Sequence, residues 1–276
     1  MKILTLVAHT FREGVAKATL WVLAGISTLI LILVAFGFST ETTANGIVLM
    51  LFGNATSPPL ESSQLAQAIA TMQATLARGL MGGVFLFGLF ATAGIIPEAL
   101  EKGIVDLYLS KPIARWELLA GKSLGAVSVM LANILYFVGA LWLVVGLKAG
   151  VWSLQFLASA LLMAFVFACF YSIVSLLAVV SRNIGIVIIG AFLYLFVVGA
   201  ALETRALGLY LLSGSAAYRT VIDGLYYIFP QLAGMQNQIT ALILDQETDW
   251  IPFVQSLASS GVIFASAAAV LHRKDF

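Results

Sequence analysis

Six long runs of the sequence contain no Asp, Glu, Lys or Arg, and this pattern constrains the fold more than any other feature. The runs cover residues 18–38, 79–96, 123–147, 151–180, 183–202 and 252–271. A helix needs about 20 apolar residues to cross about 30 Å of hydrocarbon, and its backbone groups bond one another inside the lipid. Only 10% of the 276 residues are charged, and the mean hydropathy is +1.04. We therefore expect an all-α, polytopic membrane protein with six transmembrane helices in a single domain, residues 1–276.

The distribution of basic residues predicts how these helices are oriented in the lipid bilayer. With the N-terminus inside, ten Lys and Arg residues lie in cytoplasmic segments and four lie outside. The positive-inside rule then places both termini in the cytoplasm, with the chain in the inner (plasma) membrane. The net charge of +1 argues against nucleic acid as a partner, because that binding requires a concentrated basic face.

Residues 1–16 are amphipathic and too polar to span a membrane. Their apolar positions share one helical face, and the other face carries Lys2, Thr5, His9, Arg12 and Glu13. This pattern predicts an interfacial elbow helix that lies on the membrane before the first span. A signal peptide is the competing interpretation, but the apolar run after Lys17 is too long and no small-residue cleavage site with a soluble domain follows it.

Residues 97–122 hold the densest group of charges in the chain. Four cations and four carboxylates are nearly balanced there, which suits a protein surface better than an anionic lipid surface. Leu100, Ile104 and Leu107 recur at helical spacing, so we expect a short amphipathic helix over residues 97–109 with one apolar stripe. After a bend, Pro112 suits the first turn of the next helix. An ordinary charged loop is the alternative interpretation.

The same segment resembles the first cytoplasmic loop of ABC-2 type exporter permeases. The resemblance rests on an acidic pair, a glycine, an aliphatic run ending in Ser-Lys-Pro-Ile, an arginine and a final Gly-Lys, at Glu98, Glu101, Gly103, Leu109, Ser110, Lys111, Pro112, Arg115, Gly121 and Lys122. Ile104 departs from the family, which commonly has threonine there. The segments HTFREGVAKATLW, YYIFPQLAGMQ and LHRKDF are similar to the elbow, to a Pro-containing stretch after the fifth span and to the basic tail of these permeases.

In that family the loop is a coupling helix that docks on an ATP-binding subunit. The resemblance therefore implies an ATPase-coupling interface at Glu98, Leu100, Glu101, Gly103, Ile104, Leu107, Ser110, Lys111, Pro112 and Arg115. Helix-in-groove contacts draw most affinity from a few apolar anchors, which we expect to be Leu100, Ile104 and Leu107.

The sequence predicts no catalytic residue, no metal ligand set and no cofactor site. The string WELLAGKS ends like a phosphate-binding loop, but Trp116 stands where the first glycine is needed. A lone Cys169 excludes a disulfide framework, and His9 and His272 read as solvated interface residues. No carboxylate or histidine lies inside the six runs, although ion-coupled carriers usually keep an ionisable relay there. We expect a non-enzymatic subunit whose partner hydrolyses ATP.

Residues 203–250 are expected to form external or re-entrant helices. The charge-free stretch 225–244 contains Pro230 and four side-chain amides, which are costly in lipid unless other protein groups bond them. A seventh span would also place the basic C-terminus outside. The preceding external loop, residues 39–78, is expected to end in a short external helix from about Gln64.

Three functions from different classes fit these features. The first is the permease subunit of an ABC-2 type exporter, acting as two copies or with a paralogue on two cytoplasmic ATPase subunits. The second is a permease-like subunit that transmits ATP-driven motion to a periplasmic partner, as resemblance to the copper-maturation transporter of nitrous oxide reductase implies. The third is an ATP-independent carrier or scaffold. Phe165, Phe167, Phe170 and Tyr171 in the fourth run either line a substrate path or face lipid.

Overall fold

The computed structural model describes residues 2–16, 18–44, 46–101, 103–104, 113–212 and 215–274. This part of the chain contains six helical segments long and apolar enough to cross a membrane. They are α2 (Ala18–Gly37), α3 (Ser62–Thr92) with α4 (Ile95–Ala99), α6 (Arg115–Ala149), α7 (Leu154–Ser181), the segment made by α8 (Ile184–Leu193), η1 (Tyr194–Val198) and α9 (Gly199–Glu203), and α13 (Ile251–Arg273). Each contains all or most of one predicted run, so the prediction of six spanning-length helices is confirmed.

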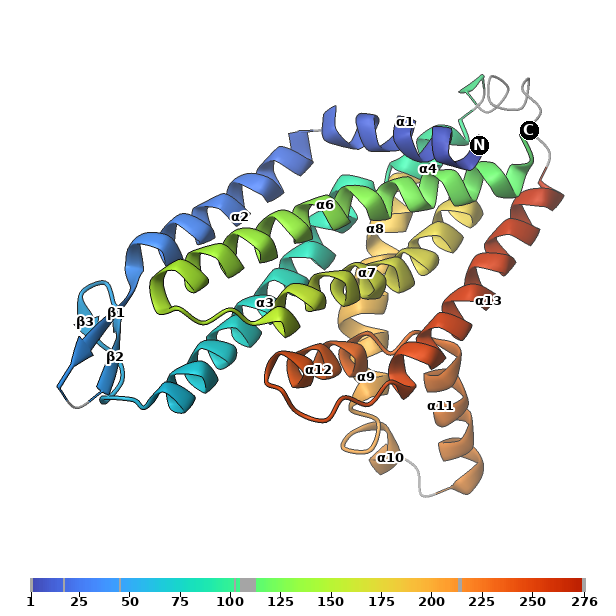
Figure 1. The fold of residues 1–276 in the computed structure, drawn as a ribbon. Helices are drawn as coiled ribbons and strands as arrows, with labels where there is room; N and C mark the ends of the chain where they lie inside the picture. The colour runs from blue at the N-terminus through green and yellow to red at the C-terminus, as the bar shows by residue number, and fades with distance from the viewer. Residues whose placement is uncertain are drawn as a thin grey trace.

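The bundle has two distinct ends (Figure 1). At one end, which we call the termini end, lie α1 (Lys2–Ala16), α4 and the last turn of α13. At the opposite end, the far end, lie a small sheet and the helices α10 (Leu209–Leu212), α11 (Ala216–Ile228) and α12 (Leu232–Ile243). The long helices connect these two ends.

Helix α7 lies at the centre of the bundle and packs against α6, α8, α12 and α13. Its Phe167, Phe170 and Tyr171 are buried, and the rings of Phe85 and Phe170 meet edge to face with centroids 5.3 Å apart. Both expected roles for this aromatic cluster, a substrate path and a lipid-facing surface, are wrong for these three residues. They form the core because α7 is surrounded by protein on several sides.

Local chemistry explains where α7 and α8 begin and end. The Ser153 hydroxyl accepts from the Phe156 amide at 3.2 Å, and the Asn183 side chain accepts from the Ile186 amide at 3.2 Å, so both N-termini are capped. Between them, Arg182 adopts a left-handed conformation with φ 52°, which ends α7. The chain can therefore reverse direction with only a two-residue connection.

The helices α2, α8 and α13 present much apolar side chain to the outside. Phe36, Ile189 and Val262 are exposed, and similar residues follow them along each helix. Exposed apolar faces of this length are expected where a helix meets lipid. The described structure is thus what a multi-pass membrane protein requires.

The expectation of an all-α chain misses a small antiparallel sheet. Strands β1 (Phe38–Thr43), β2 (Gly46–Leu51) and β3 (Asn54–Ala55) pair in the order β1-β2-β3, with Thr40 opposite Leu49. The run of Thr, Ile and Val residues favours strands, and Gly46 with φ 136° ends the first turn. A Cβ on Gly46 would lie 2.7 Å from the Leu60 carbonyl oxygen, so this close approach also requires glycine. These signals are present in the sequence, but the apolar, helix-favouring composition of the rest of the chain led to the expectation of helices alone.

The expected helix from about Gln64 is present but is not short, because it forms the first part of α3, which runs without interruption from Ser62 to Thr92. The Glu61 amide donates to the Gln64 side chain at 3.1 Å and so helps begin this helix. No glycine or proline breaks the helix before Gly79, and alanine, glutamine and leucine dominate its first half. The polar start and the apolar span are one element.

Residues 203–250 form short helices, as predicted, with Pro230 separating α11 from α12. Protein groups bond the amides that lipid could not satisfy. The Gln231 side-chain amide donates to Gln255 Oε1, Asn237 Oδ1 accepts from Arg78 at 3.3 Å, and Gln238 Oε1 accepts from the Asp249 backbone amide at 2.8 Å. Helix α12, of 12 residues, packs against α3 and α7 and is too short to span a bilayer.

Candidate functional site

The described parts of the predicted coupling segment adjoin the end of α4 and the start of α6, at the termini end (Figure 1). Its residues Glu98, Leu100, Glu101, Gly103, Ile104 and Arg115 are described, whereas Leu107, Ser110, Lys111 and Pro112 lie outside the described residues. The described part of the site consists of the end of α4 and the first turn of α6, and we refer to these two places as the roots of the segment.

The predicted helix over residues 97–109 is interrupted at Gly103. Helix α4 ends at Ala99, and Gly103 has φ 86°, a conformation incompatible with a right-handed helix. Leu100 is 5% exposed in the bundle core, whereas Ile104 is 40% exposed. The expectation that Leu100 and Ile104 share one apolar stripe for a partner is therefore wrong, and Leu100 acts as a core residue instead.

Two other members of the predicted site differ in accessibility. Glu101 is exposed beside Gly103 and Ile104, and its carbonyl oxygen accepts from the Ile104 amide at 3.1 Å. Glu98 is half-buried, and its carboxylate lies against Gly94, because a Cβ built on Gly94 would overlap Glu98 Oε1. The surface available at this root thus consists of Glu101, Gly103 and Ile104.

Arg115 connects the second root to the C-terminus of α13. Its Nη1 donates to the carbonyl oxygens of Leu271 at 3.2 Å and His272 at 3.1 Å, and also to that of Lys274. These carbonyl groups are ones that a helix end leaves without intrahelical partners, and a cation there also complements the helix dipole. In the same turn, the Ala114 amide donates to Glu117 at 2.8 Å and caps α6.

Lys274 makes the next connection, from α13 to the C-terminus of α7. Its Nζ donates to the carbonyl oxygens of Val179 at 2.7 Å and Val180 at 2.8 Å. Burial lowers the pKa of Lys274, and the nearby Arg182 charge lowers it further. Arg115 and Lys274 therefore tie the first turn of α6 to the ends of α13 and α7, and we refer to them as the Arg115–Lys274 contacts.

Gly121 and Lys122 serve the packing of α1 against α6. A Cβ on Gly121 would lie 2.5 Å from Leu6 Cβ, and a Cβ on Gly125 would lie 2.4 Å from Thr10 Cβ, so only glycine allows this approach. Lys122 Nζ lies 2.7 Å from Glu13 Oε2, and Glu13 Oε1 lies 3.2 Å from His9 Nδ1. Helix α1 is thus fixed to the start of α6 by both shape and charge.

The string WELLAGKS lies wholly within α6. A phosphate-binding loop requires a non-helical glycine turn whose amides point at the phosphates. The geometry of residues 116–123 excludes this interpretation, and Lys122 instead pairs with Glu13.

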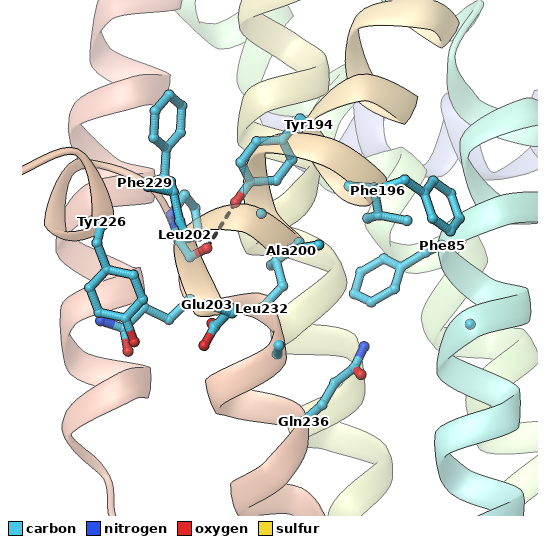
Figure 2. A pocket seen from close by; sticks show the side chains of 16 residues that line it. Phe85, Tyr194, Phe196, Ala200, Leu202, Glu203, Tyr226, Phe229, Leu232 and Gln236 are labelled. Carbon is cyan, nitrogen blue, oxygen red and sulfur yellow. Dashed lines mark hydrogen bonds between the residues drawn. The ribbon is translucent and has the colours of Figure 1, made fainter. Parts of the chain in front are cut away.

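A cavity of about 270 Å³ lies at the far end, between α3, the η1–α9 segment and the loop from α11 to α12 (Figure 2). Its walls are mostly aromatic and aliphatic, with polar groups from Glu203, Gln231 and Gln236. The π-helix η1 directs Tyr194 inward, where its hydroxyl donates to the Pro230 carbonyl oxygen at 2.8 Å. Such π-helical turns inside α-helices often occur at functional sites.

Glu203 ends the fifth spanning segment and lines this cavity. Its Oε1 accepts from the Gly234 amide at 3.2 Å, in the first turn of α12. The positive end of that helix dipole favours a carboxylate. In the described part of the chain, no basic side chain forms an ion pair with Glu203.

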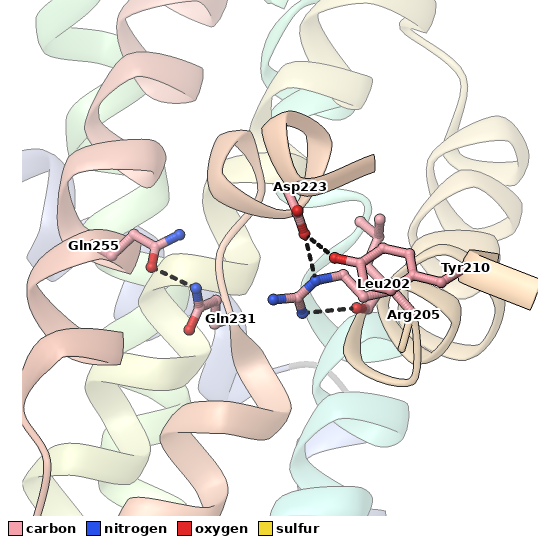
Figure 3. A network of polar contacts seen from close by, with 6 residues as sticks. All are labelled: Leu202, Arg205, Tyr210, Asp223, Gln231 and Gln255. Carbon is pink, nitrogen blue, oxygen red and sulfur yellow. Dashed lines mark hydrogen bonds and ion pairs between the residues drawn. The ribbon is translucent and has the colours of Figure 1, made fainter. Parts of the chain in front are cut away.

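A polar network lies beside the cavity (Figure 3). Arg205 Nε donates to Asp223 Oδ1 at 2.9 Å, and the Tyr210 hydroxyl also donates to that oxygen. The two hydrogen bonds, first that from Tyr210 and then that from Arg205, lower the pKa of the Asp223 carboxyl. The Arg205 guanidinium also lies 3.6 Å from the centroid of the Tyr226 ring, a cation–π contact. This network holds α11 beside the end of α9.

Sequence reasoning did not identify Glu203, Tyr194 or Gln236 as site residues. A signal was present, because Glu203 is the carboxylate that directly follows the fifth apolar run. The approach of residues 82–85 to residues 194–203 and 226–236 depends on tertiary packing, which no local pattern encodes. Within the described ranges, no three His, Cys, Asp or Glu side chains form a group that could hold a metal ion.

A comparison with models of protein families gives no match to this sequence, and a comparison with curated proteins gives none either.

Proposed function

We propose that this chain is the membrane-spanning permease subunit of an ABC-2 type exporter. Two cytoplasmic ATPase subunits would bind at its termini end, and a second permease copy or a paralogue would complete the transporter. The observation that carries the proposal is the position of the segment resembling a coupling loop: it leaves α4 and enters α6 at one end of six spanning-length helices. The apolar Ile104 is exposed on this segment, where a soluble subunit could contact it.

The contacts at the roots of this segment provide a route for motion. Displacement of residues 101–114 would act on α6 through Arg115, on α13 through the carbonyl groups that Arg115 binds, and on α7 through Lys274. Helices are stiff, so a shift at the termini end would reach the far end through them. The cavity between α3 and α9 lies at that far end.

In this proposal the chain lies in the inner (plasma) membrane with both termini in the cytoplasm. The distribution of basic residues supports this orientation, because Arg12 lies in α1, Arg115 begins α6, Arg273 ends α13, and Arg182 follows α7 near Lys274. Helix α1, amphipathic and attached to the start of α6, would serve as the interfacial elbow. The ATPase activity would belong to the partner subunits.

A related function is transmission of ATP-driven motion to a periplasmic partner. Its specific support is α11, which buries none of its described side chains and extends from the far end. The coupling segment would have the same role in both functions.

Co-purification tests the proposal. The chain is co-expressed with each ABC-type ATPase subunit of the source genome, and the complexes are isolated in detergent. We expect one subunit to co-purify, and the double substitution Ile104→Asp and Leu107→Asp to release it, because a groove that accepts apolar anchors would have to bury unpaired charge.

The matched control is Leu207→Asp at the far end, where Leu207 is also exposed. This variant should retain the ATPase. If no ABC-type ATPase co-purifies, or if the double variant inserts normally and keeps a fully active partner, the proposed function is wrong.

A further inference from the structure

We propose that the far-end cavity binds a small organic monocation with an aromatic or branched apolar body, and that Glu203 is its counter-ion. Its role as a transport site rests on the proposed function above, but binding itself requires only this chain. The inference is carried by the composition of the cavity wall, the charge of Glu203 and the arrangement of the aromatic rings.

The size of the cavity limits the ligand. A volume of about 270 Å³ lies just below the usual range for drug-sized ligands, so it suits a molecule of about ten non-hydrogen atoms. Side chains from three separate segments line it, including Phe85 from α3, Leu202 from α9 and Phe229 from the loop before α12. Such walls favour an apolar body over a strongly hydrated molecule.

The charge in the cavity selects a cation. Glu203 is the only charged residue in the cavity wall as described, and no Lys, Arg or His lines it. Its Oε1 accepts one backbone hydrogen bond, and no described group donates to its Oε2. Glu203 is half-buried, with apolar groups around it, so a bound cation would be stabilised beside its carboxylate and an anion repelled.

Arg205, a basic residue beside the cavity, does not supply that positive charge. Arg205 is paired with Asp223 at 2.9 Å (Figure 3). Its guanidinium also covers one face of the Tyr226 ring. Tyr226 itself is in the cavity wall. Arg205 therefore shapes the site from outside while its own charge is compensated.

The aromatic rings suit the same class of ligand. The rings of Tyr194 and Phe229 lie with centroids 5.5 Å apart, and Phe85 and Phe196 lie across the cavity from them (Figure 2). Ring faces attract cations, most strongly where water is excluded. A quaternary ammonium group near Glu203 with an apolar body against these rings would use both features at once.

The glycines of α3 provide a matched pair of substitutions. Gly82 lines the cavity, whereas its neighbour Gly83 does not. A Cβ at either position meets no atom within 4 Å. Gly82→Trp should therefore fill the cavity, and Gly83→Trp should place the same side chain elsewhere on the same helix.

The experiment is isothermal titration of the purified full chain in detergent, without any ATPase subunit. The probe is benzyltrimethylammonium, and benzenesulfonate is an anionic probe of similar size. We expect saturable binding of the cation alone. Glu203→Gln should weaken it by about tenfold or more, the equivalent of about 1.4 kcal/mol. Gly82→Trp should abolish it.

The controls are Gly83→Trp and Glu247→Gln, the latter an exposed carboxylate outside the cavity wall. Both should bind like the unaltered chain, and all variants should elute as single species with similar melting temperatures. Absent cation binding, equal binding of the two probes, or unchanged binding in either Glu203→Gln or Gly82→Trp would overturn the proposal. If cation binding fails while an ATPase still co-purifies, only this inference is wrong; if binding succeeds without any ATPase, only the transporter proposal is wrong.

Discussion

The ammonium nitrogen of Lys122 lies 2.7 Å from Glu13 Oε2 and joins α6 to α1. The Lys122 side chain is 5% exposed, whereas that of Glu13 is 40% exposed, so the two ends of the pair have different surroundings. The ion pair should stabilise the charge of Lys122 more than that of Glu13, because only the lysine is removed from water. The pair therefore fixes the direction of α1 along α6.

Removing the carboxylate should cost more than removing the cation. Glu13→Ala removes the carboxylate that lies beside a buried ammonium group, with an expected loss of about 2 kcal/mol. Lys122→Met leaves a half-exposed carboxylate and should cost less than about 1 kcal/mol. Thermal unfolding in detergent of the two single variants and the double variant measures the difference. Equal losses in the two single variants would contradict this asymmetry.

The glycines beneath α1 should tolerate no side chain. Gly121→Val would bring a Cβ within 2.5 Å of Leu6, so we expect α1 to separate from α6. Gly139→Val in the same helix is the control, since its Cβ meets no atom within 4 Å. Limited proteolysis near residue 17 should accelerate in the first variant only. Unchanged protection in Gly121→Val would show that α1 packs differently.

The long apolar helices were predictable because hydrocarbon imposes a length and a composition on each span, as in α7. The strands in residues 39–55 were harder to predict, because this short sheet depends on Gly46 and its contact with Leu60 as much as on β propensity. Leu100 shows a third case: its spacing from Ile104 is helical in the sequence, but α4 ends at Ala99 and Gly103 has φ 86°, so the two residues do not share one helix. The cavity around Glu203 could not be predicted, since its wall combines segments more than 100 residues apart.

The two ends of the bundle should be accessible from opposite sides of the membrane. Single cysteines at Asn54 and Glu247, both exposed at the far end, should react with an impermeant maleimide from outside intact cells. A cysteine at the exposed Glu101 should react only after the membrane is permeabilised. The native Cys169 is buried and should stay unmodified. Labelling of Glu101→Cys in intact cells would show that the orientation in the membrane is opposite to the predicted one.

The contacts of Asp223 should weaken at low pH. Hydrogen bonds from Tyr210 and then Arg205 depress its pKa in the folded protein, so its contribution is present above the unfolded pKa near 3.8 and is lost as pH falls through the lower folded value. Hydrogen exchange of residues 216–228 should accelerate when the pH falls to that range, after correction for intrinsic rates. Asp223→Asn should exchange rapidly at neutral pH already. Asp245→Asn, at the exposed end of α12, is the control.

Arg115 should determine how firmly the C-terminus of α13 is held. Arg115→Ala removes the donor that Leu271 and His272 share, so hydrogen exchange over residues 265–274 should rise by about tenfold or more, equivalent to about 1.4 kcal/mol. Arg115→Lys should restore part of this protection, because a lysine offers the charge without the planar fork of donors. Arg273→Ala is the matched control, since Arg273 is exposed in the last turn of α13.

In the complex with an ATPase, Arg115→Ala should retain assembly but lose the ATP-dependent change in labelling of a far-end cysteine at Glu247. If that change persists at full size, the Arg115–Lys274 contacts do not transmit motion between the two ends.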